Sequence, residues 1–382
     1  MSKDEIIISA AGSGKTQYIV DQALNKNGKI LITTFTEANE AELITRIINK
    51  AGCIPQNICI QTWFSFLIKH GVKPFKAKIY PHKVRGMVLV NQQSGIKYRM
   101  KNGIPVYYKE SEIEKHYFSN DGKIYSDKIA KFTLLCNYET NGYVIDRLSK
   151  IYSHIFIDEA QDLASYDLDL LRLLFISPIN LLLVCDPRQT IYQTHHATKN
   201  KKYSEGKITD FIIEKCNDLA IDIDESSLGV SHRNNEAICS LSSKLYPEYP
   251  ISKPCNCVKG KCRLSNPHEG IFLVRKNDIN HYLEEYNPMQ LRLNKNTKLI
   301  NKSFSYMNFG ISKGKSFDRV LIFPTKEMCD WLLDNNKSLK YRTRAHFYVA
   351  ITRAKYSVGI VYDFPENTDI EGIKKYEPRF SS

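Results

Sequence analysis

A glycine-rich segment near the start of the chain limits its fold more strongly than any other feature. The segment SAAGSGKT (9–16) follows an apolar run at residues 6–8 and precedes an amphipathic run at residues 16–24. Glycines let backbone N–H groups converge on a phosphate, and a helix N-terminus adds a partial positive charge. Ser9 stands where the strict pattern has glycine, while Gly12 and Gly14 keep their places. The context predicts a phosphate-binding loop between a strand and a helix.

Such a loop binds a nucleoside triphosphate together with Mg²⁺. The expected ATP-binding residues are Ser9, Ala10, Ala11, Gly12, Ser13, Gly14, Lys15 and Thr16. Within this set, Lys15 is expected to contact the β- and γ-phosphates, and the Thr16 hydroxyl to bind Mg²⁺. Downstream, the apolar residues 154–157 end in Asp158 and Glu159. Asp158 is the predicted second Mg²⁺ residue and Glu159 the base that orients the attacking water, although acids that merely cap the next helix are the alternative.

The order of apolar segments predicts an α/β fold. Short apolar runs at residues 6–8, 29–33, 154–157 and 180–185 alternate with helical patterns at 16–24 and 40–50. A second alternating series begins near residue 226 and ends with a strand at 357–362. We therefore expect two lobes with parallel sheets, at residues 1–225 and 226–382, with an insertion at about 70–140 in the first lobe.

The charge of the chain favours a polyanionic partner. It has 54 Lys+Arg and 41 Asp+Glu, a formal net charge of +13 and a pI near 9.1. Residues 70–131 contain 13 Lys/Arg and 5 Asp/Glu, so +8 of the total lies in this insertion, where tyrosines are interleaved. Basic residues bind phosphates and aromatic rings stack on unpaired bases, so the pattern favours nucleic acid. A merely basic surface is the alternative.

A series of short motifs resembles superfamily 1 DNA helicases of the UvrD/Rep/PcrA type. In chain order the motifs are SAAGSGKT (9–16), TFTEANEA (34–41), TWFS (62–65), DEAQ (158–161), DPRQTIY (186–192), SHRNN (231–235), SKGKSF (312–317) and VAITRA (349–354). The order matches that family over nearly the whole chain. The resemblance implies that the two lobes are RecA-like and that ATP binds between them.

The same resemblance implies roles for further residues. Gln189 would sense the γ-phosphate, and Arg233 and Arg353 would act as arginine fingers from the second lobe, where a planar guanidinium suits phosphate charge. These three join Glu159 as the expected catalytic residues. Phe35 and Trp63 fall where the family places residues of the DNA groove, and Tyr192 lies in its coupling segment. All three rings are expected to contact DNA, although packing in the core is the alternative for each.

The implied function is an ATP-dependent DNA helicase or translocase that moves 3′→5′ on single-stranded DNA or a tailed duplex. Only about 35 residues separate Arg275 from the motif at 312–317, so the large second-lobe insertion of longer relatives is absent from this segment. Two alternatives stay open: a translocase that serves a partner nuclease or a repair, recombination or defence protein without unwinding alone, and an RNA-directed helicase.

Ten cysteines and no leader-like start lead us to expect reduced thiols, a cytoplasmic location and no membrane segment. Cys255, Cys257 and Cys262, with His268 nearby in the sequence, form a candidate Zn²⁺ site. Their spacing lacks the usual paired Cys-x-x-Cys form, so cysteines without a metal are the alternative.

Overall fold

The computed structural model describes residues 4–191, 199–257, 262 and 266–378. The chain forms two compact units, which are described separately here. The first unit contains residues 1–7, 16–187 and 192–224, and the second contains residues 8–15, 188–191 and 225–382. The main boundary between the units therefore lies between Asp224 and Glu225. Two short segments that precede it in the sequence, residues 8–15 and 188–191, belong to the second unit.

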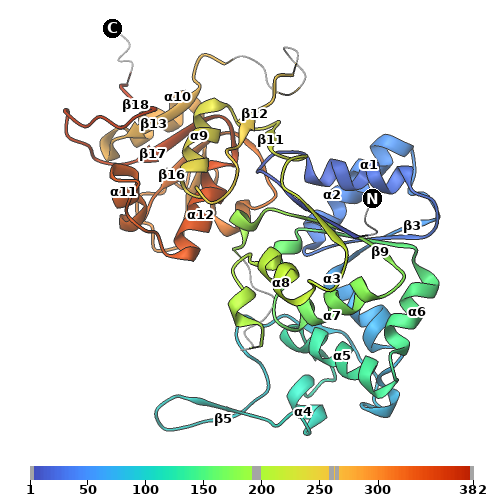
Figure 1. Ribbon diagram of the computed structural model, residues 1–382. Helices are drawn as coiled ribbons and strands as arrows, with labels where there is room; N and C mark the ends of the chain where they lie inside the picture. The colour runs from blue at the N-terminus through green and yellow to red at the C-terminus, as the bar shows by residue number, and fades with distance from the viewer. Residues whose placement is uncertain (1–3, 192–198, 258–261, 263–265, 379–382) are drawn as a thin grey trace. The chain divides into compact units, whose positions relative to one another are not determined.

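The first sheet has six strands in the order β10-β1-β9-β8-β2-β3, drawn on the right of Figure 1. Its strands are β1 (Asp4–Ile8), β2 (Ile30–Thr34), β3 (Ile58–Thr62), β8 (His154–Asp158), β9 (Asn180–Cys185) and β10 (Ile221–Asp224). Every pairing whose register is described is parallel, including Ile32 with Phe156 and Asp158 with Val184. Parallel strands buried on both faces are typically apolar throughout, as Leu181 to Val184 are here.

Helices connect these strands and bury their apolar sides. They are α1 (Lys15–Asn25), α2 (Glu37–Ala51), α3 (Trp63–Phe66), α5 (Ile129–Glu139), α6 (Tyr143–Ile151), α7 (Tyr166–Ile176) and α8 (Ile208–Lys215). Helix α2 begins at Thr36, whose hydroxyl accepts the Asn39 N–H, and ends at Gly52 with φ +79°. Both ends follow ordinary capping rules, and Leu43 and Ile47 face inward.

The basic insertion of the first unit lies outside the six-stranded sheet. It contains the two-stranded pairs β4 (Met87–Val88) with β7 (Ile124–Tyr125), and β5 (Ile96–Arg99) with β6 (Pro105–Tyr107), together with helix α4 (Ile113–Tyr117). The β5–β6 pair is antiparallel and forms a hairpin that extends away from its neighbours in Figure 1. These elements lie within residues 70–140, where the sequence predicts a basic insertion, and they belong to the first unit.

The second unit is built on another six-stranded sheet, in the order β15-β14-β16-β17-β13-β18. The strands are β13 (Gly270–Val274), β14 (Met289–Arg292), β15 (Tyr306–Asn308), β16 (Phe317–Phe323), β17 (Ala354–Val361) and β18 (Ile373–Lys375), and the helices are α9 (Glu236–Lys244), α10 (Ile279–Tyr286), α11 (Lys326–Leu333) and α12 (Tyr341–Ile351). All five pairings are parallel. The α/β prediction with two parallel sheets is thus confirmed.

Buried side chains from strands and helices form the core of the second unit. Its larger cluster joins Leu291, Val320 and Ile360 of the sheet with Trp331 and Phe347 of helices α11 and α12. Among the residues that the structure describes, no helix is long and apolar enough to cross a membrane.

Candidate functional site

The phosphate-binding loop has the backbone that its glycines allow. Gly12 and Gly14 have φ of +74° and +88°, a region that other residues rarely adopt. A Cβ atom on Gly12 would also lie 2.7 Å from Cβ of Arg233, so no side chain fits there. The buried Ser13 hydroxyl has no hydrogen-bond partner among the described residues. These features fit a loop that wraps a phosphate group, and helix α1 begins at its Lys15.

Second-unit residues hold the loop in this conformation. The Ala10 N–H donates to the carbonyl of Leu228 at 2.8 Å, and the His232 N–H donates to the carbonyl of Gly12 at 2.8 Å. The buried Arg188 guanidinium donates to the carbonyl of Ser9 at 2.6 Å. The contacts of Leu228 and His232 tie the loop to the segment around the SHRNN motif, more than 200 residues away in the sequence, and Arg188 ties it to the DPRQTIY motif.

Thr16 and Asp158 lie together in the first unit. The Thr16 hydroxyl donates to Oδ2 of Asp158 at 3.2 Å, although 142 positions separate the two residues. Asp158 ends β8 and is 3% exposed. A hydroxyl and a carboxylate oxygen at this distance are ligand types that Mg²⁺ prefers, so both fit the predicted metal role.

Glu159, the predicted base, has an uncommon backbone conformation. Its φ is +56°, and its N–H donates to Oδ1 of Asp158 at 2.9 Å. Its carboxylate accepts a hydrogen bond from the Gln161 amide, whose oxygen in turn accepts the Asp186 N–H at 3.1 Å. A left-handed non-glycine residue costs conformational energy and is found preferentially at functional sites. The hydrogen bonds hold the Glu159 carboxylate at the end of β8.

Gln189 and Arg353 are in direct contact within the second unit. Nη2 of Arg353 donates to Oε1 of Gln189 at 3.0 Å, and Nε donates to the carbonyl of Val349 at 3.1 Å. Arg353 is 1% exposed, so these bonds compensate for burial of its charge. Two residues that the resemblance assigned to different motifs therefore form one hydrogen-bonded pair.

Arg233 lies next to this pair. Its Nη1 donates to the carbonyl of Thr352 at 3.2 Å, and the neighbouring Asn234 side chain donates to the carbonyls of Thr352 and Ala354. Unlike Arg353, Arg233 is half-buried. Arg233 and Arg353, expected in the second lobe, and Gln189, expected in the first, thus all lie in the second unit near the turn between α12 and β17.

The three aromatic residues predicted to contact DNA differ in their surroundings. Phe35 follows β2, is half-buried and packs edge-on against Phe64 with ring centroids 5.4 Å apart. Trp63 is only 1% exposed, and its indole N–H donates to Asp167 at 2.7 Å. The Trp63 ring is therefore packed in the core in this structure, which agrees with the alternative given for it above. It has no face open to a base. Tyr192 lies outside the described residues.

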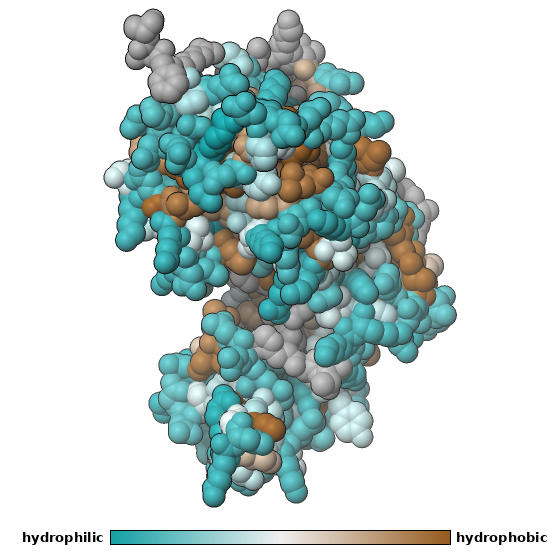
Figure 2. All heavy atoms as spheres, turned by 90° about the vertical axis from the view of Figure 1, so that its left-hand side faces the viewer, coloured by the Kyte–Doolittle hydropathy of each residue, from teal (hydrophilic) through white to brown (hydrophobic). Residues whose placement is uncertain are grey.

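The β5–β6 hairpin presents basic and apolar side chains to solvent. Lys97, Arg99 and Lys101 are exposed, and Tyr98, Met100 and Ile104 are 54%, 47% and 55% exposed. Figure 2 shows a small hydrophobic group surrounded by hydrophilic residues in the lower part of the view. Exposed rings beside cations suit single-stranded nucleic acid, where bases stack and phosphates attract the charges.

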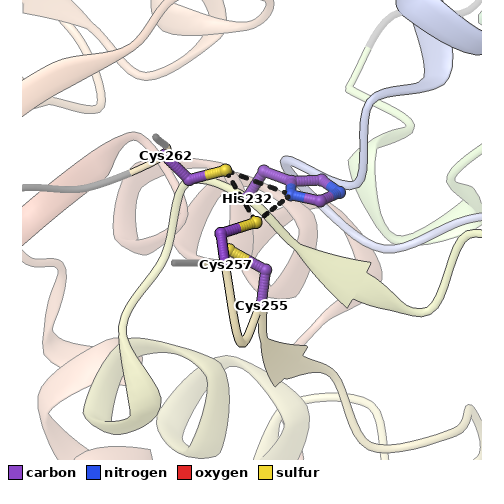
Figure 3. Close-up of side chains that lie close together, drawn as sticks. All are labelled: His232, Cys255, Cys257 and Cys262. Carbon is purple, nitrogen blue, oxygen red and sulfur yellow. Dashed lines mark hydrogen bonds between the residues drawn. The ribbon is translucent and has the colours of Figure 1, made fainter. Parts of the chain in front are cut away.

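The cysteines of the candidate metal site lie close together, but their histidine neighbour differs from the prediction. Cys255, Cys257 and Cys262 lie beside His232 (Figure 3). The His268 ring instead stacks on Phe272 and Tyr286, and its Nε2 lies 3.0 Å from the Tyr282 hydroxyl. The prediction of His268 near the cysteines was therefore wrong. Sequence distance misled it, because His232 precedes Cys255 by 23 positions and reaches the cluster only through strand pairing.

The fold and the site together define a protein with a phosphate-binding loop, two parallel α/β sheets and an acidic strand end beside Thr16. Residues 125–205 match the family of the UvrD/REP helicase N-terminal domain. The matched segment includes β8, Asp158, Glu159 and the motif that contains Gln189. The resemblance to helicases of the UvrD/Rep type is thereby confirmed for this segment. No curated protein matches the chain.

Several solved structures are similar to the chain. Arterivirus nonstructural protein 10 (helicase) is 14% identical, with 95% of this chain and 60% of that chain covered and a TM-score of 0.47. The complex of arterivirus nonstructural protein 10 with DNA is 15% identical, with 95% and 62% covered and a TM-score of 0.41. The PRRSV helicase is 14% identical, with 94% and 52% covered and a TM-score of 0.42. The present chain thus spans less than two thirds of the length of these helicases.

Proposed function

We propose that this protein is an ATP-dependent DNA helicase or translocase that moves 3′→5′ along single-stranded DNA. The UvrD-type domain match supports the helicase class. The polarity and the preference for DNA rest on the motif resemblance, in particular DPRQTIY (186–192). The observation that carries the proposal is the hydrogen bond between Gln189 and Arg353. It joins the motif that would sense the γ-phosphate to the motif that would supply the arginine finger.

In the proposed reaction, ATP supplies the scissile phosphoanhydride and Mg²⁺ neutralises phosphate charge. Thr16 and Asp158 would hold Mg²⁺ through their oxygens, and Lys15 would bind phosphate. Glu159 orients the attacking water from the fixed position that Gln161 gives its carboxylate. Arg353 and Arg233 stabilise charge that develops on the transferred group, and Gln189 changes partner when that charge leaves. Such a change of partner is the kind of event that couples hydrolysis to movement on a strand.

A second candidate is a translocase that moves on DNA without separating strands. Between Arg275 and the SKGKSF motif, the described chain forms only α10, β14, β15 and two short helical turns, at Lys276–Asp278 and Gly310–Ser312. No additional domain is present in this part of the described chain, although the resemblance places one there in longer relatives. In this case the protein would serve a partner nuclease or a repair or defence protein.

A strand-displacement assay tests both candidates. The substrates are duplexes with a 3′ DNA tail, a 5′ DNA tail or a 3′ RNA tail, each with ATP and Mg²⁺. We expect displacement only from the 3′ DNA tail, together with ATP hydrolysis stimulated by single-stranded DNA. Stimulated hydrolysis without displacement would favour the translocase. Displacement from the RNA tail alone would replace the DNA proposal, and no stimulation by any strand would refute both candidates.

A further inference from the structure

The ligand atoms of His232, Cys255, Cys257 and Cys262 lie close enough together to bind one metal ion. All four lie within 4.8 Å of one another. Nδ1 of His232 is 3.7 Å from Sγ of Cys257 and 3.5 Å from Sγ of Cys262, and the two sulfurs are 3.0 Å apart (Figure 3). Zinc bonds of about 2.3 Å to sulfur and about 2.0 Å to nitrogen give tetrahedral edges of roughly 3.5–3.8 Å. The two histidine distances agree with these edges.

Strand pairing brings the ligands together. Strand β11 (Val230–Ser231) pairs in parallel with β12 (Lys253–Pro254), with Ser231 opposite Pro254. The Cys255 N–H continues the ladder by donating to the carbonyl of Ser231 at 2.9 Å. His232 and Cys255 therefore follow the ends of two adjacent strands, where their side chains start from neighbouring positions. The arrangement depends on a hydrogen-bonded ladder rather than on closeness in sequence.

The chemistry of the four ligands favours Zn²⁺. Three thiolates and one imidazole form a common closed, structural zinc set, and soft sulfur ligands discriminate against Mg²⁺ and Ca²⁺. The competing chemistry is a disulfide between Cys257 and Cys262. Their sulfurs are 3.0 Å apart, well beyond a bond of about 2.05 Å. A disulfide would also remove two of the four ligands.

The cluster is adjacent to the residues proposed to hydrolyse ATP. His232 donates its backbone N–H to Gly12 of the phosphate-binding loop at 2.8 Å, and Arg233 is the next residue along the chain. A metal held by His232 would fix the end of strand β11, where the His232 N–H contacts the loop and where Arg233 begins. We propose that His232, Cys255, Cys257 and Cys262 bind one structural Zn²⁺ that positions Arg233 and the phosphate-binding loop. The positioning half of this proposal rests on the proposed function.

The metal is tested first without any measurement of activity. The full chain is purified with a reductant, and its zinc is measured by mass spectrometry before and after addition of Zn²⁺ and gel filtration. We expect about one equivalent in the wild type. Less than about a tenth of an equivalent after zinc addition, or a mapped disulfide between Cys257 and Cys262, would overturn the site.

Variants identify the ligands. His232→Ala and Cys257→Ser should lose the metal, whereas His232→Cys should keep it because a fourth thiolate replaces the imidazole. Cys53→Ser is the matched control, since Cys53 is exposed and outside the cluster. Cobalt offered to each protein should give the absorption of tetrahedral thiolate coordination in the wild type, Cys53→Ser and His232→Cys only. The same cobalt spectrum in wild type and His232→Ala would overturn the role of His232.

The positioning role is tested by removing zinc from the wild type with a chelator and restoring it. We expect kcat for DNA-stimulated ATP hydrolysis to fall at least about 10-fold and to recover with Zn²⁺, as is typical when groups that orient a site are lost. Unchanged kcat in the zinc-free protein would overturn positioning while leaving the metal site intact. A zinc-loaded protein that never hydrolyses ATP would refute the proposed function and, with it, the positioning role.

Discussion

At the scale of single residues, the backbone conformation and the hydrogen bonds of Glu159 hold its carboxylate in one position. Its backbone is in the left-handed region, with φ +56°, and Gln161 donates to its carboxylate. We expect Glu159→Gln to lower ATP turnover by at least about 100-fold, because an amide cannot accept a proton from water. Nucleotide binding should survive, since Lys15 and Thr16 are unchanged.

Measured turnover and fluorescent-nucleotide affinity check this prediction. Glu139→Gln, at the exposed end of α5, is the matched control and should behave as the wild type. Wild-type turnover in Glu159→Gln would mean that another group orients the water.

Arg353 and Arg233 test whether the second unit takes part in hydrolysis. We expect Arg233→Ala, and separately Arg353→Ala, to lower DNA-stimulated ATP turnover by about 10³-fold, the magnitude of other arginine fingers. Lysine should not rescue either position, because an ammonium group lacks the planar fork of the guanidinium.

Arg353 is buried and makes several hydrogen bonds, so circular dichroism must first show that its variants fold. Arg233 is half-buried, and its variant keeps the test decisive if Arg353→Ala does not fold. Arg46→Ala, which loses the surface ion pair with Glu42 and a hydrogen bond to Gln17, is the control. Normal hydrolysis by a folded Arg233→Ala would point to a simpler ATPase that works without this residue.

At the scale of elements, the β5–β6 hairpin is the best candidate for binding the phosphates of a nucleic-acid strand. Replacing Lys97, Arg99 and Lys101 together with alanine should lower the slope of log affinity against log salt by about 2. Each phosphate contact with a single strand contributes about 0.7 to that slope. Affinity for single-stranded DNA, measured by fluorescence anisotropy across a salt series, provides the slope.

The control removes the same charge from other elements of the first unit. Lys26, Lys50 and Lys150 are exposed and lie just after α1, in α2 and in α6. Their triple alanine variant should keep the wild-type slope. Equal slopes in the wild type and the hairpin variant would show that these three side chains do not touch the strand.

At the scale of the whole molecule, buried His70 makes stability depend on pH. Burial, with a smaller contribution from Arg147, lowers its pKa from 6.5 to about 4. Arg147 can only donate, so Nδ1 of His70 accepts at 3.2 Å, and Nε2 carries the proton towards the Tyr152 hydroxyl at 3.3 Å. The folded protein therefore favours the neutral form of the His70 ring over the charged form.

Between pH 6.5 and 4 the unfolded chain binds the extra proton, so stability falls as pH is lowered through this range. From pH 7 to 5 we expect a loss on the order of 2 kcal/mol from His70. Urea unfolding, followed by Trp63 fluorescence in a Trp331→Phe background, measures the free energy of unfolding of the first unit. His70→Gln should reduce the pH dependence and exposed His281→Gln should not; equal dependence in both would exclude His70 as the cause.

Much of the fold followed from local pattern, since runs such as 180–185 and the helical repeat of α2 depend on neighbours within a few residues. The edge strand β10 was not predicted, because its acidic alternation Ile-Asp-Ile-Asp becomes a strand only by pairing with β1, more than 210 residues earlier. Likewise, the basic insertion could be predicted from charge, but the hairpin that exposes Tyr98 and Met100 could not.

The sequence by itself determined the α/β class, the phosphate-binding loop and the acidic end of β8, because each depends on a short run of residues with a definite chemistry. Only the tertiary structure decided that Trp63 packs onto Asp167, that Gln189 meets Arg353, and that His232 rather than His268 joins the cysteines. These choices depend on which distant strands and helices pack together. A ring or an arginine carries the same chemistry in either setting, so its role follows from its burial and its partners.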